Sequence, residues 1–235
     1  MSRSRVLFIG GTGIISSACV RAAIAVGHEV TVLNRGSTSI RPVPPGVETI
    51  EADVRDHALV ADVVRNRDFD VVADFMSFVP AHVEFQATLW RDRVGQYIFI
   101  SSASAYQTPP DRLPIVESTP LHNPFWQYSR DKAACEAYLT SEFESRSFPA
   151  TIVRPSHTYD RTLVPFDGGW TVIERMRRGD PIVVHGDGTS LWTLTHHGDF
   201  AGAFVNLFGQ RAALGEAFHI TTDEAYTWNQ VAHLM

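Results

Sequence analysis

The sequence contains little cysteine: only Cys19 and Cys135 occur among 235 residues. Both lie in segments of helical character, which excludes a disulfide framework and a four-cysteine zinc site, so a reducing cytoplasm is the expected compartment. No apolar run approaches the roughly 18 residues of a membrane span. Basic residues are also few, 20 Lys and Arg against 26 Asp and Glu, and the formal charge of −6 argues against nucleic acid as the main partner.

Apolar residues make up 44% of the chain and charged residues 20%, a balance typical of a protein with a buried core. Apolar runs of strand length alternate with stretches of helical period. The strands expected are 5–9, 29–34, 47–52, 70–75, 96–101 and 150–154, and the helices expected are 14–26, 56–67, 80–93 and 125–146. Because most strands are apolar throughout, they suit a sheet covered on both faces. The pattern predicts an α/β fold with a Rossmann-type doubly wound parallel sheet.

The alternation changes character after Pro155, which predicts two units: an NAD(P)-binding Rossmann domain over 1–160 and a smaller substrate-binding lobe over 161–235. The short elements expected in that lobe are helices at 170–178 and 199–208 and strands at 182–185, 191–195 and 216–220. A last helix starting near Thr227 is cut short at Met235, as expected for a C-terminally truncated lobe.

A glycine-rich turn follows the first strand and opens the first helix, the one context in which such a turn is informative. Glycines allow backbone N–H groups to approach a pyrophosphate at the helix start. Ser16, in place of a usual third glycine, is small enough for close packing. The turn predicts dinucleotide binding rather than an ordinary glycine turn, and the residues expected to contact the cofactor are Gly10, Thr12, Gly13, Ile14 and Ile15.

The ends of the second and third strands bear on which cofactor binds. Asn34 and Arg35 end the second strand, where an acidic residue would favour NAD and an arginine favours the 2′-phosphate of NADP. We therefore favour NADP over NAD; the simpler alternative is a solvated arginine at a strand end. Asp53 and Val54 are expected beside the adenine, unless Asp53 or Asp56 merely caps the next helix.

Tyr128 and Lys132 are four residues apart in a predicted helix, which places a phenol and an ammonium on one face. A nearby cation favours the ionised phenol, and so would bring its pKa toward the range of a useful acid or base. Elsewhere such a pair would be an ordinary surface contact. It becomes specific after a strand ending in Ser101-Ser102, in a chain with a nucleotide-binding turn.

Together these motifs resemble the extended short-chain dehydrogenases/reductases of the NAD-dependent epimerase/dehydratase family. Further motifs that carry the resemblance are Asp53-Val54-Arg55-Asp56, Ser101-Ser102-Ala103-Ser104-Ala105-Tyr106, Arg154-Pro155-Ser156 and Gly186-Asp187-Gly188. The resemblance implies catalytic roles for Ser102, Tyr128 and Lys132: Tyr128 exchanges a proton with the substrate oxygen, Lys132 holds the nicotinamide ribose, and Ser102 donates to the developing oxyanion. It also places Phe75, Met76, Ser77, Pro155 and Ser156 beside the cofactor.

Two departures from the family pattern bear on the substrate. Ala103-Ser104 stands where family dehydratases carry an acidic pair, which argues against a 4,6-dehydratase. Trp192 stands where many nucleotide-sugar enzymes place an arginine, which favours a less charged substrate. The residues predicted to contact substrate are Phe78, Ser104, Trp126, His157 and Trp192, although core packing is the simpler interpretation of any one aromatic residue.

Metal binding is not expected: His196 and His197 are adjacent on a predicted strand, so they point different ways, and Asp199 is interpreted as a helix start. The favoured function is that of an NAD(P)-dependent oxidoreductase or epimerase, two activities that the residues do not separate. The sequence is also similar to the chloroplast stem-loop-binding branch of the superfamily, so RNA binding or NADP sensing by a relict site is the alternative. The expected partner is a small-molecule substrate, with a homodimer as the candidate assembly.

Overall fold

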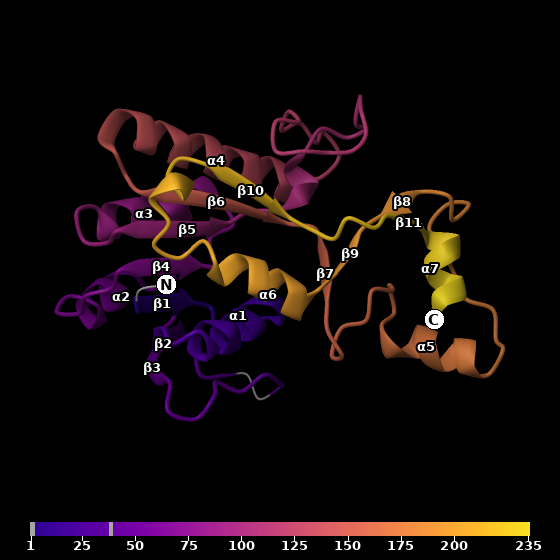
Figure 1. The fold of residues 1–235 in the computed structure, drawn as a ribbon, viewed down its shortest axis with the longest axis horizontal. Helices are drawn as coiled ribbons and strands as arrows, with labels where there is room; N and C mark the ends of the chain where they lie inside the picture. Colours follow the sequence, from indigo (N-terminus) through magenta and orange to yellow (C-terminus); the bar gives the residue numbers. More distant parts are fainter. Residues whose placement is uncertain (1–2, 38–39) are drawn as a thin grey trace.

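The computed structural model describes residues 3–37 and 40–235, and its larger part is a seven-stranded sheet (Figure 1). In spatial order the strands are β10 (Ala217–Ile220), β6 (Ala150–Pro155), β5 (Gln96–Ile100), β4 (Val71–Asp74), β1 (Arg5–Ile9), β2 (Glu29–Asn34) and β3 (Glu48–Glu51). Every neighbouring pair in this sheet is parallel. The predicted fold class, a Rossmann-type doubly wound sheet, is confirmed.

The continuous apolar runs of the sequence become the central strands. All residues of β4 and β5 are buried, and in β1 only Arg5 is exposed. Successive side chains of a strand point to opposite faces, so Val6 and Phe8 join one core while Leu7 and Ile9 join the other. Both faces are therefore covered, as a parallel sheet requires.

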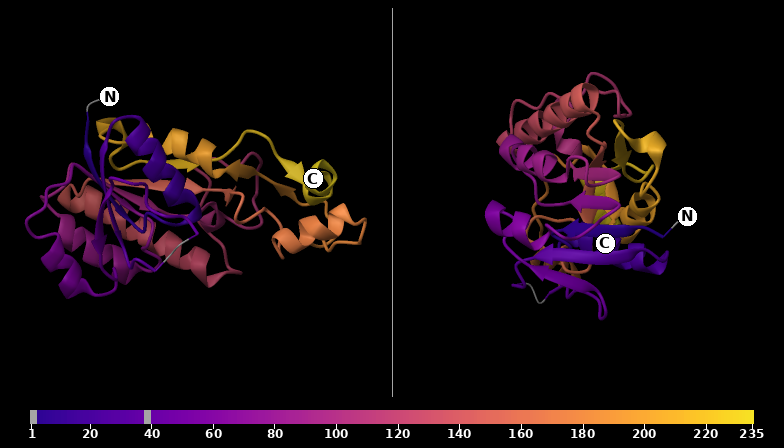
Figure 2. Two further views of the ribbon diagram at one scale, coloured as in Figure 1. Left: turned by 90° about the horizontal axis from the view of Figure 1, so that it is seen from below. Right: turned by 90° about the vertical axis from the view of Figure 1, so that its left-hand side faces the viewer.

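Helices form a layer on each face of the sheet (Figures 1 and 2). The helices α1 (Ile14–Ala25) and α6 (His197–Val205) pack on the face of Val6 and Phe8. The helices α2 (His57–Val63), α3 (Pro80–Trp90) and α4 (Gln127–Arg146) pack on the opposite face. In the described part of the chain, no helix combines the length and apolar character needed to cross a membrane.

Strand order places a crevice at one edge of the sheet. From β1 the chain adds β2 and β3 on one side, then returns to add β4, β5 and β6 on the other. Such a reversal leaves an open crevice at the carboxyl ends of β1 and β4, where ligands bind in open α/β sheets. The glycine turn after β1, the segment after β4 and the start of α1 all reach this crevice.

A smaller lobe extends from the carboxyl edge of the sheet (Figure 1). Its elements are β7 (His157–Tyr159), which pairs with β9 (Leu194–His196), β8 (Leu191–Trp192), which pairs with β11 (Tyr226–Thr227), and the helices α5 (Trp170–Arg177) and α7 (Trp228–Leu234). Its core contains Phe166, Ile173, Trp228 and Val231. Thr227 and Gln230 form a capping box that starts α7.

The prediction that residues 161–235 form one separate lobe is wrong in part. α6 packs against α1, where Phe200 and Phe204 are fully buried, and β10 is the edge strand beside β6. These apolar side chains are buried in the core between α1 and the sheet, so residues 197–220 return to the larger unit. The chain thus crosses between sheet and lobe more than once.

Several element boundaries also differ from the prediction. Residues 182–185 form no strand, because Val183 is 92% exposed and no neighbouring strand covers it. The strand expected at 191–195 is split at Thr193, since β8 and β9 pair with different partners. β7 was not predicted, and α6 starts at His197 rather than Asp199, with the His196 side chain accepting a hydrogen bond from Gly198 N.

Candidate active site

The turn between β1 and α1 depends on its glycines. Gly10 has φ of +85°, a conformation that favours glycine, and a Cβ there would lie 2.5 Å from Met76 Cγ. Gly10 N donates to Leu33 O at 2.9 Å, which ties the turn to β2. The Ser16 hydroxyl accepts from Gly13 N and donates to Gly10 O, so it closes the turn where a third glycine is usual.

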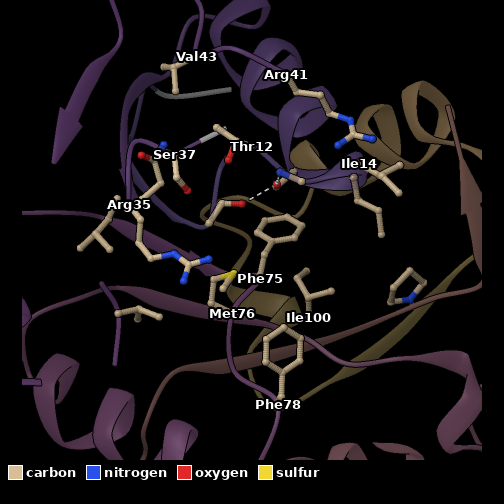
Figure 3. A pocket seen from close by; sticks show the side chains of 18 of the residues that line it. Thr12, Ile14, Arg35, Ser37, Arg41, Val43, Phe75, Met76, Phe78 and Ile100 are labelled. Carbon is tan, nitrogen blue, oxygen red and sulfur yellow. Dashed lines mark hydrogen bonds between the residues drawn. The ribbon is translucent and has the colours of Figure 1, made fainter. Parts of the chain in front are cut away.

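A cavity of about 970 Å³ lies at the carboxyl ends of the strands, above this turn (Figure 3). Of the predicted cofactor and catalytic residues, those that line it are Gly10, Thr12, Gly13, Ile14, Ile15, Asn34, Arg35, Asp53, Val54, Phe75, Met76, Ser102, Tyr128, Lys132, Pro155 and Ser156. We call this cavity the cleft. One continuous space therefore joins the glycine turn to the Tyr128 and Lys132 pair.

Ser77 is the one predicted cofactor residue that is not among those lining the cleft. It is 1% exposed, and its hydroxyl donates to Asp74 Oδ2 at 2.6 Å. Asp74 also accepts from the backbone N–H groups of Met76 and Ser77 and from the Tyr97 hydroxyl. The buried Asp74 carboxylate thus orders the segment after β4, and the Ser77 side chain supports the cleft wall from behind.

The end of β2 carries a basic group and, unexpectedly, an acidic neighbour. Arg35 lines the cleft and extends into it in Figure 3, while Asn34 Oδ1 accepts from Gly36 N at 2.8 Å and shapes the turn. The sequence showed no carboxylate here, but β3 pairs Glu51 with Asn34. A Cβ at Gly36 would lie 3.1 Å from Glu51 Cδ, so this carboxylate borders the turn without lining the cleft.

Two aspartates, Asp53 and Asp56, follow β3, and they make different contacts in the structure. Asp56 caps α2, because its side chain accepts from Leu59 N at 3.0 Å. Asp53 lines the cleft and accepts from Arg55 N with one carboxylate oxygen. The other Asp53 oxygen has no such bond among the described contacts, so Asp53 can accept a hydrogen bond from an adenine amino group.

Lys132 lies at the base of the cleft with almost no exposure, 2%. Its ammonium donates to Ser77 O at 2.6 Å and to Ile100 O at 2.7 Å, and lies 4.9 Å from the centre of the Phe78 ring. An ammonium has three N–H groups, so one is left for a ligand. Burial lowers the pKa of Lys132 to about 8, which leaves it mostly charged at pH 7.

Tyr128 has the opposite pKa shift to the one expected from its spacing to Lys132. Burial raises the pKa of the phenol, and a hydrogen bond to Ser102 only partly opposes this rise. The Lys132 ammonium lies 5.7 Å from the centre of the Tyr128 ring. Desolvation is the largest cause of the shift, so the phenol is neutral at pH 7.

A chain of hydroxyl groups approaches Ser102 from behind the cleft. Ser129 Oγ donates to Ser104 Oγ at 2.9 Å, and Ser104 Oγ lies 2.9 Å from Ser102 Oγ. Ser104 N also donates to Ser102 Oγ. Because Ser104 already accepts from Ser129, its own hydrogen is available to Ser102. Ser102 accepts from Ser104 N, and when the Ser104 hydroxyl donates to it as well, the Ser102 proton is free to point into the cleft.

The five predicted substrate residues are not gathered in one place. Phe78 lines the cleft, and the exposed Trp126 ring lies 4.8 Å from the Tyr128 ring, centre to centre. Ser104 lies behind Ser102, as described above. His157 and Trp192 pack against each other and against Trp228 in the smaller lobe, with ring centres about 6 Å apart. Neither is among the residues that line the cleft.

Arg41, Arg55 and Thr158 line the cleft but were not predicted as site residues. The Arg55 side chain donates to Met76 O and lies over the Phe78 ring at 5.8 Å, which links the ends of β3 and β4. Its place directly after Asp53-Val54 was the available signal. Nothing local marked Arg41, whose partners are over a hundred residues away.

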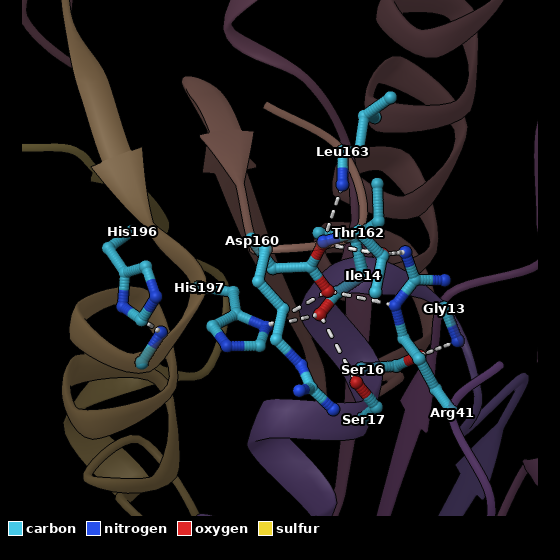
Figure 4. Close-up of polar contacts among 12 residues, drawn as sticks. Gly13, Ile14, Ser16, Ser17, Arg41, Asp160, Thr162, Leu163, His196 and His197 are labelled. Carbon is cyan, nitrogen blue, oxygen red and sulfur yellow. Dashed lines mark hydrogen bonds and ion pairs between the residues drawn. The ribbon is translucent and has the colours of Figure 1, made fainter. Parts of the chain in front are cut away.

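Arg41 belongs to a buried polar group beside the start of α1 (Figure 4). Arg41 Nε donates to Asp160 Oδ2 at 2.9 Å, and Asp160 Oδ1 accepts from the hydroxyl and N–H of Thr162. His197 Nδ1 lies 3.7 Å from Asp160 Oδ2 and 3.0 Å from Ile14 O. Within residues 3–37 and 40–235, no three His, Cys, Asp or Glu side chains gather as a metal site would require.

Comparison with known proteins places the whole arrangement in one family. The model of the NAD dependent epimerase/dehydratase family matches residues 6–221. The chain is 28% identical to the chloroplast stem-loop binding protein of 41 kDa b from Arabidopsis thaliana, over 98% of this chain and 62% of that protein. It is also 28% identical to 2′-dehydrokanamycin reductase from Streptomyces kanamyceticus, over 97% of this chain and 64% of that protein. The chain therefore spans less than two thirds of the length of these relatives.

Solved structures share the fold. Pal from Bacillus thuringiensis superposes with a TM-score of 0.84 at 21% identity, over 98% of this chain and 82% of that one. UDP-glucose 4-epimerase from Thermotoga maritima gives a TM-score of 0.81 at 21% identity, over 98% and 81%. dTDP-glucose 4,6-dehydratase from Bacillus anthracis, solved in complex with NAD, gives 0.81 at 18% identity, over 97% and 78%.

Proposed function

The chain belongs to the NAD dependent epimerase/dehydratase family, and we propose that it is an NAD(P)-dependent reductase or epimerase of a small, sugar-like substrate. The observation that carries the proposal is that Ser102, Tyr128 and Lys132 line the same cleft as the glycine turn. A proton donor and a dinucleotide site in one cavity are what hydride transfer at a hydroxyl or carbonyl carbon requires.

The cleft fits a nicotinamide dinucleotide in its position and its lining. It lies where the strand order reverses. Gly10 has no side chain, so its backbone is accessible just before α1, and a Cβ at this position would collide with Met76. Two structures that share the fold, the dTDP-glucose 4,6-dehydratases from Bacillus anthracis and Streptomyces venezuelae, were solved with NAD. Such a cofactor, when bound, supplies or accepts a hydride at the reacting carbon.

Tyr128 moves the proton in this proposal. Its pKa is raised by burial, so the resting phenol is protonated and is prepared to donate to a carbonyl oxygen, which is the direction of reduction. Donation leaves a phenolate close to the charged Lys132 ammonium, which stabilises it. In the direction of oxidation the phenolate takes the hydroxyl proton instead, so one residue serves both directions.

Ser102 stabilises the charge that develops on the substrate oxygen. The hydroxyl chain through Ser104 and Ser129 orients the Ser102 proton toward the cleft. Ser104, predicted to contact substrate, acts here as a positioning residue for Ser102. A preoriented donor is effective because it does not reorganise as the charge forms.

Arg35 and Glu51 set the choice between NADP and NAD. Arg35 lines the cleft, whereas Glu51 borders the same turn from outside the lining, so NADP is the preferred cofactor by a modest margin. Arg35→Ala should weaken NADPH by several-fold and leave NADH unchanged in calorimetric titrations. Equal losses for the two cofactors would contradict the phosphate role.

The substrate side of the cleft is rich in aromatic rings and hydroxyl groups. Phe78 and Trp126 flank the Lys132 and Tyr128 pair. The Ser156 hydroxyl, in the cleft, bonds to Thr195 and Thr221 and so connects the cleft to the smaller lobe, which contains His157 and Trp192. These groups suit an uncharged, hydroxylated substrate. The name of the relative 2′-dehydrokanamycin reductase describes reduction of a hydroxylated, sugar-derived molecule, although that molecule also carries amino groups.

The decisive experiment compares Tyr128→Phe with Tyr138→Phe. Both change the same group on α4, but Tyr138 packs against the core outside the cleft. Consumption of NADPH is followed with a panel of keto-sugars and other small carbonyl compounds. Tyr128→Phe should lower kcat by about 10²- to 10⁴-fold with cofactor affinity within a few-fold, while Tyr138→Phe remains active. Full activity of the Tyr128 variant would refute the mechanism.

A second candidate function is RNA binding, favoured by one observation. The Arabidopsis relative, similar over nearly all of this chain, is named for binding a stem-loop. The formal charge of −6 opposes it, and so does the presence of Ser102, Tyr128 and Lys132 in one cleft, which RNA binding does not need. Gel-shift titration with stem-loop RNA, alongside NADPH titration, separates the two functions.

A further inference from the structure

Arg41 lines one end of the cleft, and residues from a distant segment of the chain bind its guanidinium. It comes from the segment between β2 and β3, and its guanidinium donates to Asp160 and to the Thr162 hydroxyl, both in the segment after β7. The side chains are largely buried, with exposed fractions of 17% for Arg41 and 3% for Asp160. Because its guanidinium is bound to two side chains, Arg41 is held in one orientation before any ligand binds.

Within residues 3–37 and 40–235, these contacts leave most of the guanidinium N–H groups of Arg41 without an acceptor. Of five N–H groups, the contacts to Asp160 and Thr162 use two. Arg41 lines the cleft together with Gly13 and Ile14, and Figure 3 shows it next to Ile14 at the cleft rim. The remaining donors are therefore available beside the start of α1.

The start of α1 is already suited to an anion. The first N–H groups of a helix have no acceptor within the helix, and α1 has no acidic residue in its first turn. Asp160 is an acidic group close to this helix start, because His197 Nδ1 lies 3.7 Å from Asp160 Oδ2 and 3.0 Å from Ile14 O. Its carboxylate is ionised: although burial opposes ionisation, hydrogen bonds from Arg41, Thr162 and Leu163 N hold its pKa well below the ordinary range. Without a cation, that charge would repel a phosphate at the glycine turn.

We propose that Arg41 is a diphosphate-binding residue of the cleft, oriented by Asp160 and Thr162, for the cofactor in the proposed function on which this inference rests. Two planar donors of the guanidinium match phosphate oxygens, and the helix start supplies further N–H groups. Arg41 thus differs in role from Arg35: Arg35 faces the 2′-phosphate that only NADP carries, whereas Arg41 faces the diphosphate that NADP and NAD share.

Arg41 also neutralises Asp160, and the test must separate that effect from direct contact. Calorimetric titration measures the Kd of NADPH, NADH and ADP-ribose for wild type, Arg41→Ala, Asp160→Asn and the neutral pair Arg41→Gln/Asp160→Asn. The neutral pair removes both buried charges together, so it retains the fold if Arg41→Ala does not. Arg65→Ala is the matched control, since Arg65 is an exposed arginine paired with Asp62 outside the cleft.

Direct contact predicts that Arg41→Ala and the neutral pair weaken all three ligands by a similar factor, about 10- to 100-fold. Asp160→Asn, which keeps Arg41, should bind at least as tightly as wild type, and Arg65→Ala should match wild type. Wild-type affinity in the neutral pair would show that Arg41 only neutralises Asp160, and would overturn the proposal. A loss confined to NADPH would assign Arg41 to the 2′-phosphate and overturn it as well.

The result also distinguishes this inference from the proposed function. If wild type binds the cofactors and the neutral pair binds equally well, the role of Arg41 is refuted while the enzyme proposal stands. If wild type binds none of the three ligands, the proposed function itself is refuted, and the role of Arg41 with it.

Discussion

The buried ammonium of Lys132 leads to a quantitative prediction about stability and pH. In the folded protein its pKa is lowered from 10.5 to about 8, chiefly by burial, although the nearby Asp74 and Glu136 carboxylates oppose this shift and Arg55 adds to it. A lowering of this size corresponds to roughly 3 kcal/mol. Below pH 8 the ammonium is charged in both states, so the folded state bears the full cost of burying it.

The sign follows from proton binding. Between pH 8 and 10.5 the unfolded chain holds more protons than the folded one at this residue, so the free energy of unfolding rises with pH. The contribution from Lys132 should increase by roughly 2 kcal/mol between pH 7 and pH 9.5. Replacing the residue by methionine removes this contribution. It also leaves Ser77 O and Ile100 O without their donor at every pH, which shifts the stability without adding a slope.

The assay is urea unfolding of wild type and Lys132→Met at pH 7 and pH 9.5. Other groups titrate in this range, among them the Cys135 thiol, whose pKa is raised by burial to about 12. Since these groups are present in both proteins, they largely cancel in the difference. The difference in unfolding free energy, wild type minus variant, should grow by roughly 2 kcal/mol toward pH 9.5. A difference that does not change with pH would refute the reasoning.

Three further predictions concern single contacts. Glu136→Gln leaves the buried Arg154 guanidinium without its carboxylate partner at 2.6 Å, and should lower the free energy of unfolding by about 3 kcal/mol in urea titrations; an unchanged midpoint would contradict this. Gly10→Ala should destabilise the protein more than Gly27→Ala, because both glycines have positive φ but only at Gly10 does the added Cβ meet a neighbour; equal melting temperatures would oppose it. Glu51→Gln should improve NADPH affinity a few-fold relative to NADH by calorimetry, and no change would show that this carboxylate does not reach the phosphate.

Much of the fold could be predicted from local patterns. The apolar runs of β1, β4 and β5 indicate strands covered on both faces, and the position of Gly10 to Gly13 between a strand and a helix indicates the turn. The four-residue spacing of Tyr128 and Lys132 places them on one helix face regardless of what surrounds them. Such features depend only on residues close together in the chain, so the sequence by itself determined them.

Contacts between distant segments were decided only by the tertiary structure. α6 packs on the main sheet, where Phe200 and Phe204 are buried, and β10 pairs with β6, although the local pattern of residues 197–220 resembles that of the lobe. Glu51 reaches the turn after β2 through the register of two strands, and Arg41 meets Asp160 across 119 positions. Burial also set the direction of the Tyr128 pKa shift, because desolvation depends on the surrounding atoms and not on the spacing to Lys132. Periodicity records which face of an element is apolar, while the partner of that face is selected by packing of the whole chain.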